Sequence, residues 1–157
     1  MKKITPLLFL TLLGTLALTS CKKVDDPLVP REQSPVLVYI EDAPYQSGFS
    51  GEPTVLYSLS TPVTLRARIL ELDKTNLLDY KKGIDSIPVP NLKIAVMLRN
   101  GTSLGDATTD AKGRITLTKT WAELGVSAVK AGSSVSLSWT GTYKDITFTR
   151  LSKVQAR

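Results

Sequence analysis

The chain has 157 residues, a formal net charge of +6, no histidine and one cysteine. Without histidine, it lacks both the side chain that most often acts as a general acid or base near neutral pH and the commonest zinc ligand. A single cysteine cannot form an intrachain disulfide. The basic residues are scattered, with no run longer than two lysines, so we expect no nucleic acid partner.

The N-terminus has the layout of an export signal. Lys2 and Lys3 form a short cationic region, and residues 4–18 are apolar except for Thr, Pro and Gly. A run of about 15 residues fits the apolar part of a signal peptide and is shorter than the roughly 20 residues that span a bilayer. We therefore predict that residues 1–20 are a signal peptide.

The residues that follow suggest a lipid anchor. Leu18-Thr19-Ser20-Cys21 resembles the lipobox of bacterial lipoproteins, which implies a diacylglyceryl group on the Cys21 sulfur and an acylated α-amine. Several acyl chains would make this attachment to membrane lipid effectively permanent. The alternative is an unmodified cysteine after an apolar helix. Residues 22–26 resemble the charged tether of Bacteroidota-type surface lipoproteins, so the expected location is the outer membrane, with the protein surface-exposed or facing the periplasm.

The mature chain divides into a tether and one domain. Residues 22–35 contain three prolines and six charged side chains, so we expect residues 21–35 to be the lipidated cysteine and a flexible tether. In residues 36–157, apolar side chains recur at every second position, as in Val63, Leu65, Ala67 and Ile69. This pattern predicts an all-β domain, an antiparallel β-sandwich of seven to eight strands, with a small closed barrel as the alternative.

Four short segments are predicted to connect the strands. Asn100-Gly101, Asp110–Gly113 and Gly141-Thr142 have residues typical of turns. Thr120–Glu123 has the spacing of a capping box and predicts about one turn of helix. The strand patterns also predict that three aromatic residues pack in the core, namely Tyr39, Trp139 and Phe148.

One of these turns carries a family resemblance. Residues 105–117 resemble the hairpin of bacterial immunoglobulin-like and carboxypeptidase-regulatory-like domains, in which Asp-x-x-Gly forms the turn between two strands. Asp110 can accept hydrogen bonds from the turn backbone, and Gly113 can adopt a positive φ. The resemblance covers roughly residues 91–119 and implies an immunoglobulin-like sandwich. It implies no activity, because a fold does not carry a function with it.

No catalytic, cofactor-binding or metal site is predicted, and we expect a protein that is not an enzyme. The serines have no histidine base, and no Ser-x-x-Lys occurs in the predicted domain. The acidic pairs Glu41-Asp42 and Glu71/Asp73 are interpreted as solvated loop charges. Asp106 and Asp110 are accompanied by too few oxygen ligands for calcium.

Aromatic residues in predicted loops are the candidate partner contacts. Tyr45 and Phe49 lie among Gly, Ser and Pro, and Tyr80 lies in the long connection between Asp73 and Pro90. Loops of this composition form adaptable binding surfaces, and long connections are often functional. The alternatives are that Tyr45 and Phe49 close one end of the core, and that the long connection forms a short helix packed on the sheet.

The same connection contains a candidate modification site. Asp85-Ser86-Ile87 resembles the three-residue acceptor for O-glycosylation of exported proteins in Bacteroidota-type bacteria, which implies a glycan on Ser86.

Together these features predict a non-enzymatic, membrane-anchored lipoprotein that binds a glycan, a host molecule or an envelope protein through loops of a β-sandwich. The alternative is a structural spacer or an assembly subunit of an envelope or surface complex, which would dock through its sheet edges.

Overall fold

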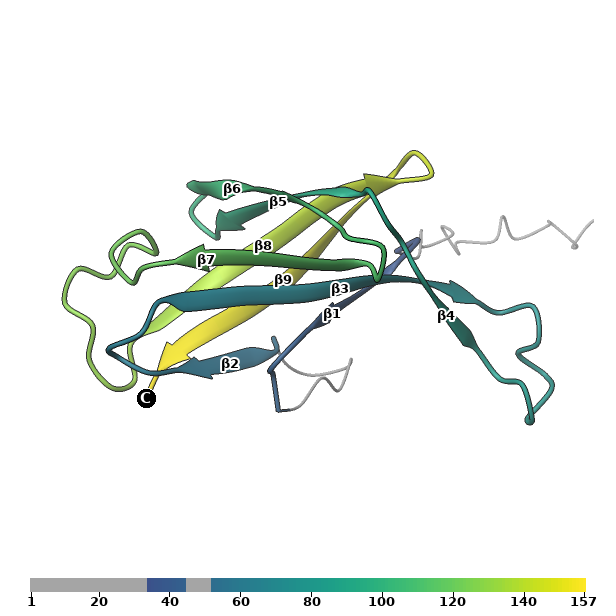
Figure 1. Ribbon diagram of the computed structural model, residues 1–157, viewed down its shortest axis with the longest axis horizontal. Helices are drawn as coiled ribbons and strands as arrows, with labels where there is room; N and C mark the ends of the chain where they lie inside the picture. Colours follow the sequence, from purple (N-terminus) through teal and green to yellow (C-terminus); the bar gives the residue numbers. More distant parts are fainter. Residues whose placement is uncertain (1–33, 45–51) are drawn as a thin grey trace, which may run out of the picture. The chain divides into compact units, whose positions relative to one another are not determined.

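Every regular element in the described part of the chain, residues 34–44 and 52–157 of a computed structural model, is a β-strand (Figure 1). The predicted all-β sandwich is confirmed, with one strand more than the sequence pattern indicated. The nine strands are β1 (Leu37–Ile40), β2 (Thr54–Tyr57), β3 (Val63–Asp73), β4 (Asp85–Pro88), β5 (Lys93–Leu98), β6 (Ser103–Thr108), β7 (Arg114–Lys119), β8 (Ser134–Tyr143) and β9 (Ile146–Ala156).

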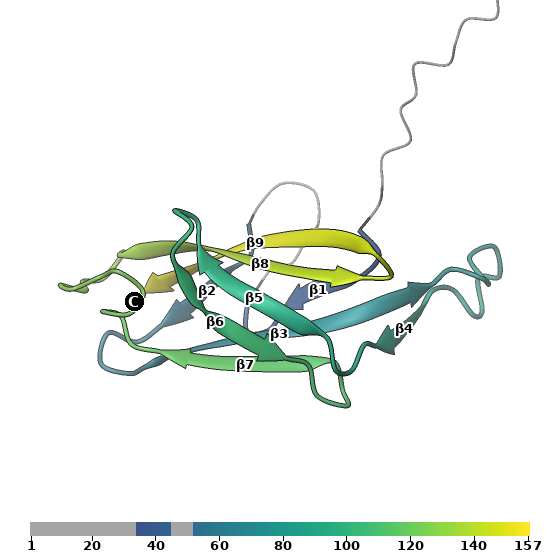
Figure 2. The ribbon, with the colours of Figure 1, turned by 90° about the horizontal axis from the view of Figure 1, so that it is seen from above.

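The strands form two sheets, which Figure 2 shows as two layers. In the first sheet, β3 pairs with β1, β4 and β7, and the second sheet has the order β2-β9-β8-β5-β6. All pairings are antiparallel except that of β2 with β9, which is parallel. With β3 and β7 in one layer and β5, β8 and β9 in the other, the two antiparallel-rich sheets form a β-sandwich.

The core lies between the layers and follows the predicted alternation. Val63, Leu65, Ala67 and Ile69 of β3 are buried, while Arg66 between them is exposed. This is the period of two that a strand imposes on its side chains.

Aromatic burial was predicted correctly for two of three residues. Trp139 and Phe148 are 1% and 5% exposed, and the Trp139 indole Nε1 donates to the buried Ser152 hydroxyl at 2.8 Å. Tyr39 is 41% exposed, so its predicted burial is wrong. In β1, Val38 and Ile40 point inward instead. Since both faces of β1 carry apolar residues, alternation alone could not select the buried one.

Two predicted turns are confirmed. Asn100-Gly101 joins β5 to β6, and Gly101 has a φ of 92°. Asp110–Gly113 connects β6 to β7, and the Asp110 carboxylate accepts the backbone N–H groups of Lys112 and Arg114 at 2.8 and 2.9 Å. The second connection is not a hairpin, however, because β6 and β7 belong to different sheets. The Asp-x-x-Gly turn therefore carries the chain from one layer to the other.

The predicted turn at Gly141-Thr142 is wrong, because β8 runs through both residues. The β8–β9 turn is made by Lys144 and Asp145, with φ values of 50° and 63°, as in the two-residue hairpins that match the twist of their strands. Gly141 instead provides space. A Cβ there would lie 2.6 Å from Ile94 Cδ1 and 2.9 Å from Phe148 Cζ.

The predicted capping box forms without a helix. Glu123 Oε2 accepts the Thr120 backbone N–H at 2.7 Å, and the Thr120 hydroxyl accepts the Glu123 N–H at 3.2 Å. A single helical bond follows, from Leu124 N to Thr120 O at 3.1 Å, and Gly125 has a φ of 83°. The reciprocal bonds therefore close a compact turn that buries Trp121 and Leu124.

The long connection after Asp73 is neither only a loop nor the short helix given as its alternative. It contains no helix; it folds back as β4, which pairs with the last residues of β3 from Leu70↔Pro88 to Asp73↔Asp85. Residues 74–84 then connect the two strands.

Candidate functional site

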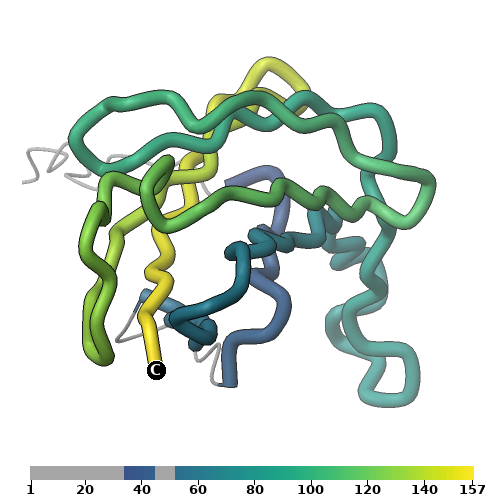
Figure 3. Tube along the Cα trace, turned by 60° about the vertical axis from the view of Figure 1, so that its left-hand side comes forward, coloured from purple at the N-terminus to yellow at the C-terminus, as the bar shows by residue number. Residues whose placement is uncertain are grey.

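A hairpin arm extends from the first sheet. We define the arm as Leu70–Asp73 of β3, residues 74–84 (the tip) and β4. β7 pairs with Val63–Arg68 of β3, and β4 pairs with the next residues of the same strand. Figures 1 and 3 show β4 and the tip extending away from the two layers. The second sheet does not cover them, and all four residues of β4 are exposed.

The arm exposes large apolar side chains. Leu78 is fully exposed, and Tyr80 and Leu77 are 89% and 55% exposed. Ile84 and Ile87 are each nearly half exposed. Isolated exposed apolar residues are ordinary, whereas a group on one projecting element indicates an interaction surface.

Backbone hydrogen bonds fix the course of the tip. Leu77 N donates to Lys74 O at 3.0 Å, and Asp79 N donates to Asn76 O at 2.9 Å. Gly83, with a φ of 64°, donates to Asp79 O at 2.8 Å. These consecutive turns hold Leu77, Leu78 and Tyr80 on an ordered loop.

The tip is basic. Residues 74–84 contain three lysines and one aspartate, which gives a net charge of +2. The one aspartate, Asp79, accepts the backbone N–H of Lys81 at 3.0 Å. The Lys81 ammonium lies 5.9 Å from the centre of the Tyr80 ring, within the range of a cation–π contact.

Polar contacts brace the arm at its base. Glu71 of β3 pairs with Lys144 and accepts a 2.7 Å hydrogen bond from the Tyr143 hydroxyl. The bonds from Lys144 and Tyr143 hold the pKa of the Glu71 carboxyl below its ordinary value, and the bond to Glu71 raises the pKa of Lys144. Glu71 is therefore an ion-paired link between β3 and the β8–β9 turn, not the solvated charge that we expected.

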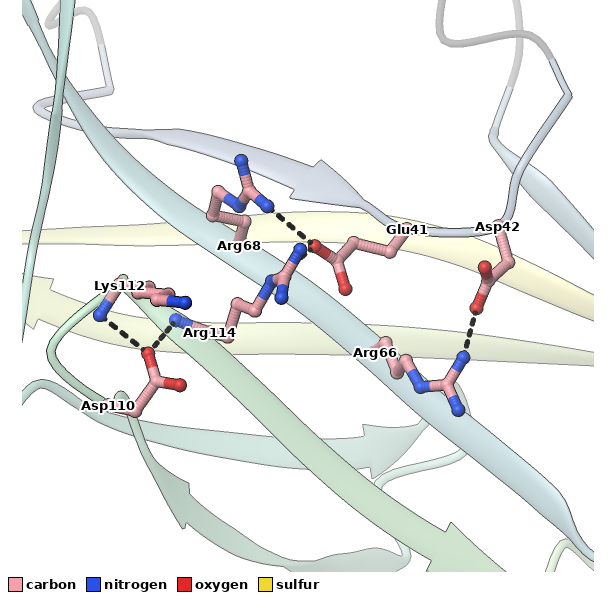
Figure 4. A network of polar contacts seen from close by, with 7 residues as sticks. All are labelled: Glu41, Asp42, Arg66, Arg68, Asp110, Lys112 and Arg114. Carbon is pink, nitrogen blue, oxygen red and sulfur yellow. Dashed lines mark hydrogen bonds and ion pairs between the residues drawn. The ribbon is translucent and has the colours of Figure 1, made fainter.

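Glu41 and Asp42 are likewise paired, as Figure 4 shows. Glu41 Oε1 lies 2.9 Å from Arg114 Nε and 3.3 Å from Arg68 Nη2, and Asp42 pairs with Arg66 at 3.1 Å. These contacts join the end of β1 to β3 and β7. Glu41 and Asp42 therefore brace the first sheet, whereas the Asp73 carboxylate accepts the backbone N–H of Thr75 in the tip.

A cleft of about 450 Å³ lies between β1 and β9, lined by Val36, Val38, Phe148, Arg150 and their neighbours. The buried Nε atom of Arg150 has no hydrogen-bond partner among the described residues. On the outer side of β9, β2 pairs only with Lys153–Ala156. No described strand pairs with the earlier part of β9 on that side.

The predicted site residues fall into two groups. Cys21, Tyr45 and Phe49 lie outside the described residues. Tyr80 and Ser86 both lie on the arm, where Ser86 pairs with Leu72 in the hairpin and is exposed. Sequence reasoning placed both in one long connection but did not join Tyr80 with Lys81 and Lys82 into one exposed surface. The length and apolar content of the segment between Asp73 and Pro90 were the sequence features that could have indicated this surface.

Other kinds of site are not found in the described residues. Residues 34–44 and 52–157 contain no group of three or more His, Cys, Asp or Glu side chains that could hold a metal ion. Asp106 pairs with Lys93 at 2.7 Å, and Asp110 caps its turn. Over the same residues, no helix is long and apolar enough to cross a membrane.

No protein-family model and no curated protein matches the chain. The fold defines its class: an all-β sandwich of two sheets, here with an exposed apolar and basic arm.

Proposed function

We propose that the chain is a non-enzymatic lipoprotein, anchored in the outer membrane through Cys21, that recognises an envelope component, a glycan or a host molecule through loop side chains held by the sandwich. The observation that carries the proposal is the arm, where Tyr80, Leu77 and Leu78 are exposed on an ordered loop. Tyr is a common interface residue, since its ring offers a large apolar surface and a polar end.

The ion-paired framework also supports recognition rather than catalysis. Among the described residues, three of the four carboxylates expected as solvated charges, Glu41, Asp42 and Glu71, are paired with arginine or lysine. The pKa of Glu52 is lowered by its bond from Arg99. A general acid needs a pKa near the working pH, and the bonds from Arg99 and Lys144 move the pKa values of Glu52 and Glu71 in the opposite direction.

The recognition proposal is tested by replacing Tyr45, Phe49 and Tyr80 together with Ala. The variant should fold and should lose retention of the partner obtained from an envelope extract. Ala128, an exposed loop residue in another part of the sandwich, provides the matched control as Ala128→Ser. Partner retention by the triple variant at the wild-type level would contradict the proposal.

The anchor is tested separately. Cys21→Ala should abolish lipid labelling and release the protein from the membrane fraction, because the thiol is the proposed acylation site. Normal processing and continued membrane association of the variant would show that the lipoprotein proposal is wrong.

The cleft between β1 and β9 favours a second candidate, an assembly subunit that accepts a strand from an envelope protein. A partly unpaired strand edge is a template for strand addition. Photo-cross-linking in cells separates the candidates, with a cross-linker at Leu37 in the cleft or at Tyr80 on the arm. Recognition through the arm predicts cross-links from position 80, and assembly through the cleft predicts them from position 37.

A further inference from the structure

The tip combines three features on residues 74–84. Leu77, Leu78 and Tyr80 are exposed, the net charge is +2, and the ring of Tyr80 has an ammonium group beside it. Leucine gives apolar surface without hydrogen-bonding capacity. Tyrosine favours the boundary between headgroups and acyl chains, and a lysine side chain can bury its methylenes while its charge stays in water.

The charges of the tip suit a surface of opposite sign. Lys81 and Lys82 follow Tyr80 directly, and the carboxylate of Asp79 accepts the Lys81 backbone N–H. Asp73 and Asp85 lie at the closing pair of the hairpin, below the tip. Asp73 is turned toward Thr75, whose N–H it accepts at 2.8 Å. A basic segment of this kind is attracted to anionic lipid headgroups.

The backbone of the tip is also suited to shallow burial. A loop that enters the membrane interface must satisfy its own peptide groups. The turns at Leu77, Asp79 and Gly83 provide internal partners for backbone N–H groups around the apolar side chains.

A glycan would need a different surface. Sugar recognition uses hydrogen-bonding side chains placed around a free aromatic face, whereas here Lys81 lies over the Tyr80 ring and leucines precede it. We infer that the tip inserts into an anionic lipid surface, with Leu77, Leu78 and Tyr80 at the level of the headgroups and Lys81 and Lys82 on the lipid phosphates. The inference rests on the proposed function in taking the arm as the recognition element, and it names the ligand class of that element.

The test uses the full chain with Cys21→Ser, so that acylation plays no part. Leu78→Cys carries an environment-sensitive nitrobenzoxadiazole label at the tip, and Ala128→Cys carries the same label in a distant exposed loop. Both residues are exposed, so the fold should be retained, which circular dichroism verifies. Because both proteins share the same N-terminal segment, any attachment through that segment affects them equally.

The vesicles contain phosphatidylcholine alone or about one part phosphatidylglycerol to two parts phosphatidylcholine. With the anionic vesicles, the label at position 78 should shift to shorter wavelength and be quenched by spin-labelled lipid. The label at position 128 should not respond. Lys81→Gln with Lys82→Gln should weaken the response at position 78 by roughly 30-fold in the lipid concentration required, since each lysine near an anionic surface contributes about a factor of five.

Equal behaviour of the two labels, or a response at position 78 that ignores phosphatidylglycerol, would overturn the inference. So would a response to envelope proteins in detergent without any response to vesicles. In that last case the arm would still be a recognition element, and the proposed function would stand.

Discussion

The two halves of β3 have different surroundings, although they form one continuous strand. In the first half, Val63, Leu65 and Ile69 are almost completely buried between the layers. In the second half, Leu70–Asp73 are only partly buried and pair with β4, whose four residues are all exposed. The strand pairing is equally regular in both halves. Burial therefore depends on whether a second sheet faces the strand, and backbone pairing alone does not provide it.

The two regions therefore have different roles. The sandwich provides the free energy of folding, because buried apolar surface is its main source. The arm adds hairpin bonds but little core, so its sequence is open to selection for binding. The external partner that we propose would account for apolar side chains at the tip that add nothing to the core.

The largest expected effect tests the core side of this comparison. Trp139→Ala or Phe148→Ala should lower the free energy of unfolding by about 3–5 kcal/mol, as for other large aromatic cavities. Tyr80→Ala, on the arm, should change it by less than about 0.5 kcal/mol. Chemical denaturation measures all three. Similar losses from the core and arm variants would remove the distinction between the regions.

A smaller effect is expected where the two regions meet. At Gly113, which has a φ of 71°, a Cβ would lie 2.4 Å from the Ile69 carbonyl oxygen. Ile69 N donates to Gly113 O at 2.8 Å, and Ile69 O accepts from Val89 N at 3.1 Å. Gly113→Ala should therefore cost more than about 2 kcal/mol, because the collision adds to the strain of a positive φ.

Gly101→Ala is the matched control. Gly101 also has a positive φ, of 92°, but open space surrounds its Cβ position, so only the conformational cost of about 1–2 kcal/mol applies. Equal losses for the two variants would show that the contact with Ile69 does not matter.

A pH effect is expected at the end of β2 in the sandwich. Burial raises the pKa of the Tyr57 phenol to about 12 from its ordinary value of 10, and the Asp42 carboxylate acts in the same direction. Because the folded state holds this proton more tightly, the contribution to stability is complete below pH 10 and is lost as the pH rises toward 12.

Ultraviolet titration of the phenols, with unfolding measured across the same range, checks this effect. Wild type should show a phenol that ionises near pH 12, and Tyr57→Phe should lack that step. The Tyr143 phenol, whose pKa is raised by its bond to Glu71, should titrate alike in both proteins. Tyr80 is largely exposed on the arm, so Tyr80→Phe should leave the late step unchanged. A step near pH 12 that survives Tyr57→Phe with its full amplitude would contradict the assignment.

The smallest expected effect on stability is that of Ser86→Ala, which removes the predicted glycosylation site. Ser86 is exposed on β4, so Ser86→Ala should not change folding. If the acceptor pattern is used, natively expressed protein should have a mass excess that Ser86→Ala removes. An intact mass equal to that of the polypeptide would refute the modification.

Alternation predicted the sandwich because it reflects a local cause, namely that successive side chains of a strand point to opposite faces. It did not predict β4, whose sequence Asp85-Ser86-Ile87-Pro88 contains a proline and no buried position. Proline is compatible with a strand at the edge of a sheet, and β4 has only β3 as a partner. Neither propensity nor burial could therefore reveal it.

Features that depend on distant neighbours were also missed. Gly141 resembles a turn residue in sequence, but the reason for glycine is the approach of Ile94 and Phe148 from other strands. Glu41 and Glu71 resemble loop charges in sequence. Folding brings arginines to Glu41, and it brings a lysine and a tyrosine to Glu71. The exposed tip was identified as a candidate contact through Tyr80, whereas its projection from the sandwich required the structure.

The central claim, that the arm serves recognition and not folding, is tested most directly by shortening it. Asp73 and Asp85 are the closing pair of the hairpin, so Asn-Gly in place of residues 74–84 gives a two-residue turn of the favoured type. We predict that the free energy of unfolding of the shortened chain differs from that of the wild type by less than about 0.5 kcal/mol. We also predict that the shortened chain no longer retains envelope components. Retention at the wild-type level by this stable, shortened chain would contradict the account.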